Sequence, residues 1–315
     1  MTVLGPARAT RPGGVAHQRR RRRFPWFAYV VLLPTFGVLG VFAYYPAVSG
    51  LWHSFYDWRP GFNSPFVGLA NYRQMVGDDL WWKSFENLGL IFAVSVTVMW
   101  ALPMLAAELV ISLRSARAQF IFRTLLIAPL AFPGVVTVLV WDFMYNPNDG
   151  VINRFLNSVG LGSLAHNWVG EPHTALPALL AIGFPWIASL PFLIFLSQLQ
   201  NIPVELFEAA SLDGAGRIRR FLAVDLPLLS RQIRLLFFLA TISVLQYGFA
   251  AYLVTQGGPD NATQVPVLRM LGVAFQGQEW GYAAALSSVL FVITLAFSGV
   301  VFLVRRKDDG NVATL

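Results

Sequence analysis

The chain has 315 residues, of which 56% are hydrophobic and only 12% are charged, and its formal net charge is +7. Soluble domains carry about 25% charged residues, so this composition indicates an integral membrane protein rather than a soluble one. The chain has no cysteine, which excludes disulfides, thiol catalysis and cysteine metal sites. The four histidines lie far apart without ligand spacing, so we expect no metal site.

Residues 1–23 mix glycine, proline, alanine and arginine without periodicity and end in the basic run Arg19–Arg23. We expect a disordered basic tail. A basic run can indicate nucleic acid, but this one directly precedes an apolar segment. The anionic surface of the cytoplasmic membrane leaflet is therefore the better partner, and we expect no nucleic-acid partner.

Residues 24–45 form the first predicted transmembrane helix, because this stretch carries no charge and is long enough to cross a bilayer. A cleaved signal peptide is the alternative, since Ala47-Val48-Ser49 resembles a cleavage site. Signal hydrophobic regions run about 7–15 residues, so we expect an uncleaved helix. Residues 46–85 are polar and rich in tryptophan and tyrosine, which is typical in part of a membrane interface. We expect them to form an extracytoplasmic loop.

The rest of the chain predicts an all-α membrane core over residues 86–304. Only helices or closed barrels satisfy backbone groups in lipid, and these apolar runs are too long for barrel strands. Including the first, six transmembrane helices are expected, the other five at about residues 88–111, 125–145, 175–199, 235–254 and 282–304. Residues 201–234 are a polar segment between two of these helices, and residues 305–315 form a second tail.

The positive charges predict the orientation. Seven lysine and arginine residues lie in residues 1–23, three in the loop before residue 125, five in residues 201–234 and three after Val304. The other side carries five: Arg59, Arg73, Lys83, Arg154 and Arg269. Because basic residues favour cytoplasmic loops, both termini and residues 201–234 are predicted to be cytoplasmic.

Polar side chains inside the predicted helices are candidates for function. Glu108 lies near the cytoplasmic end of its helix, where we expect a structural role, either snorkelling to the interface or pairing with Arg114. Gln246 and Tyr247 lie in the middle of residues 235–254 and need partners inside the bundle. Amide groups and aromatic rings suit a sugar-like ligand, so these two residues, with Trp141 and Trp186, are candidate pathway residues. Helix–helix hydrogen bonding is the alternative for Gln246.

The sequence carries no recognisable energy source for uphill transport. It has no P-loop, because neither lysine stands in a Gly-Lys-Ser or Gly-Lys-Thr context, and it has no Gly-x-Ser-x-Gly nucleophile elbow. The carboxylates within the helices, Glu108 and Asp142, both lie near helix ends rather than deep in the membrane. We therefore expect the chain to be one part of a larger machine.

One family resemblance rests on residues 201–234. Glu208-Ala209-Ala210 is followed by Gly214 and then by Val224-x-Leu226-Pro227. This order resembles the EAA motif of the inner-membrane subunits of binding-protein-dependent ABC importers. Asp213, Ala215 and Phe221 make it similar to the carbohydrate branch, which includes maltose-type and glycerol-3-phosphate-type permeases. Three further groups of residues resemble the same branch: Leu199-Gln200-Asn201-Ile202-Pro203; Trp141, Gly150 and Asn153; and Thr255-Gln256-Gly257-Gly258-Pro259 with Thr263.

The resemblance covers about Trp81 to Val304, with mild departures at Val224 and Val254. It implies a type I ABC importer permease fold in the inner membrane of a bacterial cell. In that family two permease subunits pair around a translocation pathway, and each places a coupling helix in a cleft of a cytoplasmic ATPase dimer. An extracytoplasmic solute-binding protein delivers the ligand. ATP and magnesium bind to the ATPase, so no cofactor is expected in this chain.

We call residues 201–234 the coupling segment, and the resemblance implies that its contacts with the ATPase come from Glu208, Ala209, Ala210, Asp213, Gly214 and Ala215. The residue chemistry is consistent with this role. A helix dipole favours a glutamate near the helix start, alanines allow close approach of two backbones, and glycine allows a turn with positive φ.

Two rival functions remain open at this point. A membrane enzyme acting on a glycosidic or lipid-linked substrate would need paired acids, for which Asp142, Asp149 and Glu171 are the candidates. A sensor subunit would bind the same partners without moving solute.

Overall fold

A computed structural model describes residues 26–312, without the side chains of residues 27–28 and 301–312. The prediction of a basic tail over residues 1–23 lies outside the described residues. Within them the secondary structure is helical, as predicted. The β-type pairing among these residues is a single isolated antiparallel bridge between Tyr56 and Phe66. The chain divides into two units, residues 1–48 and 49–315, which we describe separately.

The described part of the first unit is a bent apolar helix. Helix α1 (Trp26–Leu39) continues through a π-turn, η1 (Gly40–Tyr44), into α2 (Tyr45–His53). The Tyr45 N–H donates to the Gly40 carbonyl, one residue further back than in an α-helix. This wider turn precedes Pro46, which has no N–H and whose ring crowds the preceding turn. Large apolar side chains are exposed along α1, as expected for a lipid-facing helix.

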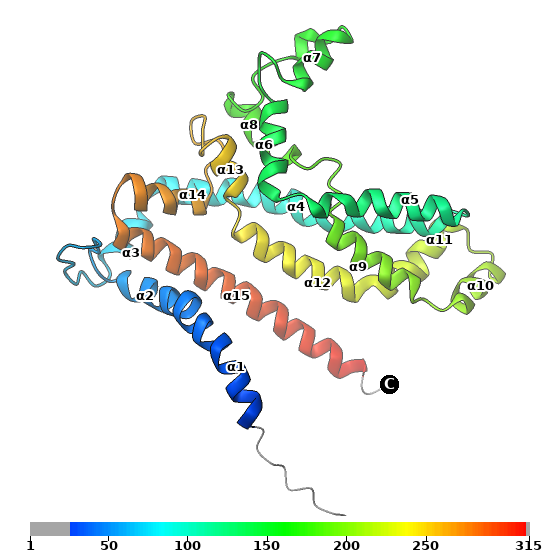
Figure 1. Cartoon of the computed structure of the whole chain (residues 1–315), viewed down its shortest axis with the longest axis horizontal. Helices are drawn as coiled ribbons and strands as arrows, with labels where there is room; N and C mark the ends of the chain where they lie inside the picture. The colour runs from blue at the N-terminus through cyan, green and yellow to red at the C-terminus, as the bar shows by residue number, and fades with distance from the viewer. Residues whose placement is uncertain (1–25, 313–315) are drawn as a thin grey trace, which may run out of the picture. The chain divides into compact units, whose positions relative to one another are not determined.

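The second unit contains the remaining helices (Figure 1), and their bounds are as follows. They are α3 (Ala70–Val76), α4 (Asp79–Ser112), α5 (Ala116–Ile127), η2 (Ala128–Ala131), α6 (Gly134–Met144), α7 (Val151–Ser158), η3 (Gly162–Leu164), α8 (Pro172–Ala181), α9 (Ser189–Gln200), α10 (Val204–Leu212), α11 (Arg217–Arg220), η4 (Phe221–Asp225), α12 (Leu226–Leu245), α13 (Phe249–Val254), α14 (Pro266–Leu271), η5 (Gly272–Gln276) and α15 (Trp280–Val312).

Four helices in the described chain are long and apolar enough to cross a membrane: Tyr29–His53, Asp79–Ser112, Arg217–Val254 and Trp280–Val300. Two bent pairs raise the number to as many as six, which is the number predicted from the sequence. One pair is Ala116–Ala131 with Gly134–Met144, bent by 94°, and the other is Ser189–Gln200 with Val204–Leu212, bent by 72°.

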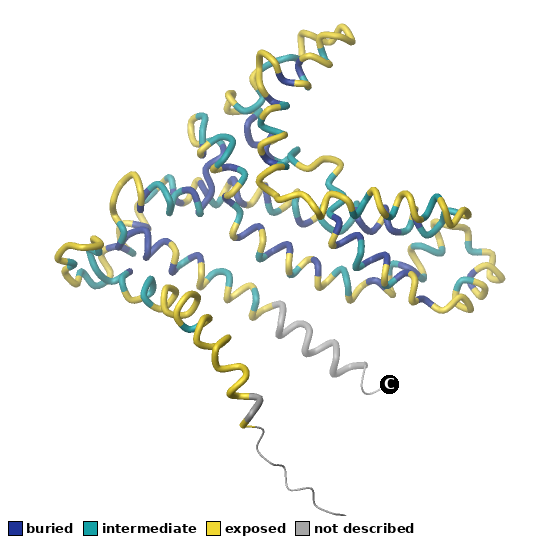
Figure 2. The backbone as a smooth tube through the Cα atoms, in the orientation of Figure 1, coloured by how far each residue is buried: buried dark blue, intermediate teal, exposed yellow. Residues whose placement is uncertain are grey.

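The core of the second unit surrounds α4. Helices α9 and α12 pack along it, and the buried residues gather where these helices face one another (Figure 2). One apolar cluster centres on Ala107, Phe192 and Leu229, near the coupling segment. A second cluster joins α4 to α8, α13 and α14, and a third lies where α3, α14 and the start of α15 meet. Helix α4 therefore contacts elements at both ends of the bundle.

Two stretches predicted as continuous helices are interrupted. Residues 175–199 divide into α8 and α9 around Gly183 and Trp186, which both have positive φ. Residues 235–254 divide at Gly248, where an added Cβ would lie 2.7 Å from Val267 Cγ1. This contact with α14 explains why the chain has glycine there. Residues 46–85, predicted as a loop, include the end of α2, helix α3 and the start of α4.

Candidate functional site

The coupling segment folds as a short helix, a tight turn and a second helix. Helix α10 ends at Asp213, and Gly214 follows with φ +72°, the left-handed conformation predicted for it. The Gly214 N–H donates to the Ser211 carbonyl and the Ala215 N–H to the Ala210 carbonyl, at 3.1 and 2.9 Å. These two bonds form a Schellman motif, which satisfies carbonyls left free at the helix end. These two hydrogen bonds therefore fix the turn of the chain at Gly214.

The motif residues of this segment do not all face the same way. Glu208, Ala209, Asp213 and Gly214 are exposed. Ala210 is only 9% exposed, so most of its side chain is covered by this chain itself, and its predicted contact with the ATPase stays a prediction. Ala215 is half-buried, within the turn.

Apolar side chains stand on the outside of the same segment, and the sequence analysis missed them. Leu212 is 89% exposed and Ile218 is 78% exposed, on either side of the Gly214 turn. Large apolar residues exposed on a polar segment indicate an interaction surface. Their position beside charged residues, Leu212 before Asp213 and Ile218 between Arg217 and Arg219, was a signal that could have identified them.

A buried ionic contact connects the coupling segment to α4. The Arg220 guanidinium donates through Nη2 to Glu108 Oε1, and through Nε to Asp225 Oδ2 at 3.2 Å. The Glu108 side chain is 16% exposed and that of Asp225 is fully buried. The prediction that Glu108 pairs with Arg114 is therefore wrong.

The same guanidinium also contacts α10. Arg220 Cζ lies 5.0 Å from the centre of the Phe207 ring, in a cation–π arrangement. Phe207 in turn packs against the apolar cluster of α4, α9 and α12. Arg220 thus contacts three elements, α10, η4 and α4, and η4 is a π-turn just before Pro227. Helices α10 and α4 are therefore joined by contacts of this one side chain.

The four candidate pathway residues have different surroundings in the structure. Gln246 is exposed at the break that ends α12, not inside a helix, and makes no side-chain hydrogen bond to another described residue. Tyr247 packs against the second apolar cluster. Trp186 donates its indole N–H to the Leu180 carbonyl at 2.8 Å, and Trp141 lies against Tyr145, with ring centres 5.6 Å apart. No described contact joins the four.

The acids proposed for an enzyme are not paired with one another. Asp149 binds Arg154 at 2.9 Å, and Glu171 accepts a hydrogen bond from the Asn167 backbone. Asp142 lies on α6, half-buried. Among the described residues this arrangement supplies no two-carboxylate centre.

Several residues of the family pattern have a structural explanation at the bundle end far from α10. An added Cβ at Gly150 would lie 2.3 Å from the Asn146 carbonyl oxygen, so only glycine fits. Asn153 is buried, donates to the Pro147 and His166 carbonyls and accepts from the Trp168 indole. Nearby, the Tyr145 hydroxyl donates to the Ala178 carbonyl at 2.8 Å. These contacts fix the loop that follows α6.

An ionic contact also lies at this far end. Asp78, the N-cap of α4, accepts from Arg269 of α14 at 2.8 Å and from the Tyr282 hydroxyl of α15 at 2.6 Å. Burial acts to raise the pKa of Asp78, but the hydrogen bonds from Tyr282, Arg269 and the Trp81 backbone outweigh it and lower that pKa below its ordinary value. Asp78 is therefore ionised at neutral pH.

This geometry can be compared with known proteins. Residues 88–309 match the family described as the binding-protein-dependent transport system inner membrane component. The chain belongs to this family. It is a permease subunit of an ABC importer, a membrane component that works with a solute-binding protein and is not itself catalytic.

Two relatives cover nearly the whole chain. It is 31% identical to the diacetylchitobiose uptake system permease protein NgcF of Streptomyces coelicolor, over 98% of this chain and 92% of that protein. It is 34% identical to the sn-glycerol-3-phosphate transport system permease protein UgpA of Yersinia enterocolitica, over 90% of this chain and 95% of the relative.

Among solved structures, a permease chain of a bacterial ABC transporter involved in the import of the acidic polysaccharide alginate has the same fold. The TM-score is 0.79, and the match covers 90% of this chain and 96% of that one, at 21% identity. This likeness supports the type I importer fold and leaves the solute open.

Proposed function

We propose that this permease imports a sugar or related solute, forms half of the translocation pathway with a second homologous permease, and couples through α10 to a cytoplasmic ATPase dimer. ATP and magnesium then bind to that partner. The orientation follows the charge distribution, with both termini and the coupling segment in the cytoplasm. Relatives named for diacetylchitobiose and sn-glycerol-3-phosphate support the solute class.

The coupling proposal rests on which side chains of the coupling segment are exposed and which contact the bundle. It presents Glu208, Asp213 and Leu212 outward around a capped turn, while Arg220 connects the same segment to α4. A segment built only to join two helices would not need an apolar side chain that is 89% exposed beside a buried ionic contact. A partner that binds α10 would therefore act on the core of the bundle.

Gly214→Asp tests this proposal. The turn needs φ +72°, and any side chain there adds strain and a charge on the proposed contact surface. We expect the variant to insert in the membrane but to lose solute uptake and the ATP hydrolysis stimulated by the binding protein. The matched control is Gly216→Asp, which adds the same charge two residues away at φ −66°, with open space around it. Wild-type uptake by Gly214→Asp would refute the coupling role.

A further inference from the structure

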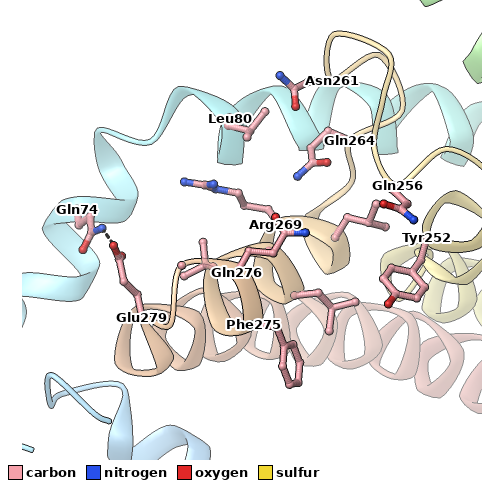
Figure 3. Close-up of a pocket in the computed structure, with 15 residues that line it drawn as sticks. Gln74, Leu80, Tyr252, Gln256, Asn261, Gln264, Arg269, Phe275, Gln276 and Glu279 are labelled. Carbon is pink, nitrogen blue, oxygen red and sulfur yellow. Dashed lines mark hydrogen bonds between the residues drawn. The ribbon is translucent and has the colours of Figure 1, made fainter. Parts of the chain in front are cut away.

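A cavity of 790 Å³ lies at the end of α4 opposite the coupling segment (Figure 3). Its walls come from α3, the start of α4, α13, α14, η5 and the loops around them. The volume falls within the range of small-molecule sites, about 300–1,000 Å³. None of the four candidate pathway residues lines it, so it is a separate place in the fold.

The polar lining of the cavity consists mainly of amides. Gln256, Gln264 and Gln276 contribute side chains, and Gln264 is only 8% exposed. Its amide makes no hydrogen bond to another described residue and is accessible from the cavity, so its donor and acceptor groups are available to a ligand. The closeness of Gln264 to Gly257, where an added Cβ would lie 2.1 Å from Gln264 Oε1, fixes its position. Each amide can both donate and accept hydrogen bonds, as hydroxyl groups require.

The positive charge in the cavity lining is already compensated. Arg269 is the cation in the lining, and its guanidinium binds the Asp78 carboxylate through two nitrogens, at 2.8 and 2.9 Å. The lining acid, Glu279, accepts a hydrogen bond from Gln74 at 3.0 Å (Figure 3). An anionic ligand would therefore meet no uncompensated cation and one carboxylate. A neutral ligand needs no cation in the site and is not repelled by the Glu279 carboxylate.

Two exposed aromatic rings complete the lining. Tyr252 from α13 and Phe275 from η5 both lie along the cavity. Aromatic faces pack against the flat C–H faces of sugar rings, while amides bind the hydroxyl groups at their edges. Amides, aromatic rings and compensated charge together match a neutral polyhydroxylated molecule.

We propose that this cavity is a binding site for neutral sugar units, used as solute passes between the binding protein and the membrane pathway. The proposal rests on the proposed function, because it assumes that solute enters at the end of the bundle opposite the coupling segment. It adds a selection rule: neutral sugars bind here, and phosphorylated solutes do not.

Saturation-transfer NMR tests the site on the full chain assembled with its partner subunits in nanodiscs, without the binding protein. The probes are maltose, cellobiose and N,N′-diacetylchitobiose as neutral disaccharides, and sn-glycerol 3-phosphate as the anion. Gln264→Leu removes the buried amide and keeps the side-chain size similar. We expect it to weaken binding of the bound disaccharide about tenfold, the effect of one hydrogen-bonding group. The matched control, Gln200→Leu, changes an exposed glutamine at the end of α9 and should have no effect.

A second variant covers the case in which Gln264→Leu does not assemble. Gln276→Leu lies at an exposed position of the lining and should also weaken disaccharide binding. Equal binding by both lining variants and the control would overturn the site. Displacement of the disaccharide by sn-glycerol 3-phosphate would overturn its selection rule.

The outcomes also separate this site from the proposed function. If the lining variants bind normally while Gly214→Asp abolishes uptake, only the cavity proposal fails. If the lining variants lose binding while Gly214→Asp retains uptake, the coupling proposal fails and the cavity remains a ligand site.

Discussion

Arg220 offers the sharpest test of how the coupling segment is joined to the bundle. Its guanidinium binds Glu108 on α4 and Asp225 on η4, and it lies over the Phe207 ring of α10. Arg220→Met keeps an apolar chain of similar length and removes the charge. We expect it to lower the stability of the purified chain and to weaken ATP hydrolysis stimulated by the binding protein.

The magnitude follows from what the substitution leaves behind. Glu108 and Asp225 are 16% and 0% exposed, so both carboxylates lose their cation in a largely dry environment. Removing one partner of a buried ion pair costs about 3–5 kcal/mol, and loss of the cation–π contact adds about 0.5–1 kcal/mol. Asp225 Oδ1 already lacks a hydrogen-bond partner among the described residues, so the site has no spare donor to compensate.

Thermal unfolding, followed by tryptophan fluorescence in detergent, measures the effect on stability. Arg219→Met is the matched control, because Arg219 is the exposed neighbour on the same turn. Adding Glu108→Gln to Arg220→Met removes one unpaired charge and should restore part of the lost stability. We expect the two substitutions to be non-additive by about 0.5–3 kcal/mol, as for residues in direct contact.

The reasoning is refuted if Arg220→Met and Arg219→Met unfold at the same temperature, or if the Arg220 and Glu108 substitutions are additive. If Arg220→Met had normal stability but reduced stimulated ATPase activity, Arg220 would belong to the surface that contacts the partner and not to the ionic contact with Glu108 and Asp225.

Two further predictions concern opposite ends of the bundle. Leu212→Asp should leave the unfolding temperature unchanged, because the side chain is 89% exposed, but should weaken co-purification with the ATPase subunit; unaltered co-purification would remove Leu212 from the contact surface. The lowered pKa of Asp78 stabilises the fold above the unfolded-state value of about 3.9, and this contribution is lost as pH falls through the lower folded-state pKa. Asp78→Asn should therefore unfold at a lower temperature than wild type at neutral pH, and the difference should shrink on acidification below about pH 4; a difference independent of pH would contradict the assignment.

The sequence predicts local features of the coupling segment well. Glycine at position 214 allows a turn with positive φ, and the structure has φ +72° there. That prediction needed only neighbouring residues. The partner of Glu108 needed more, because Arg220 is 112 positions away in the chain. Choosing Arg114 by proximity in sequence was wrong because α4 ends at Ser112 and the chain turns away before Arg114, which is exposed.

The break in residues 235–254 has a similar cause. Hydropathy favours one continuous helix there, and nothing local shows that Gly248 has to accommodate Val267 of α14. The cavity lining was likewise not predicted, since Gln256 and Gln264 come from the loop between α13 and α14, and Gln276 comes from a π-turn that only the fold brings beside it. The interruption also explains why Gln246 is exposed at a helix end instead of buried in a helix.

The two ionic contacts make α4 the element that joins the proposed sites. At its start, Asp78 binds Arg269 and Tyr282 beside the cavity, and near its end Glu108 binds Arg220 of the coupling segment. Helix α4 has 34 residues and is therefore about 50 Å long. Helix α4 also packs against α9 and α12, so its two ends belong to one helix within a packed core. We therefore expect a partner that moves α10 to change the contacts around Arg269, and with them the walls of the sugar cavity.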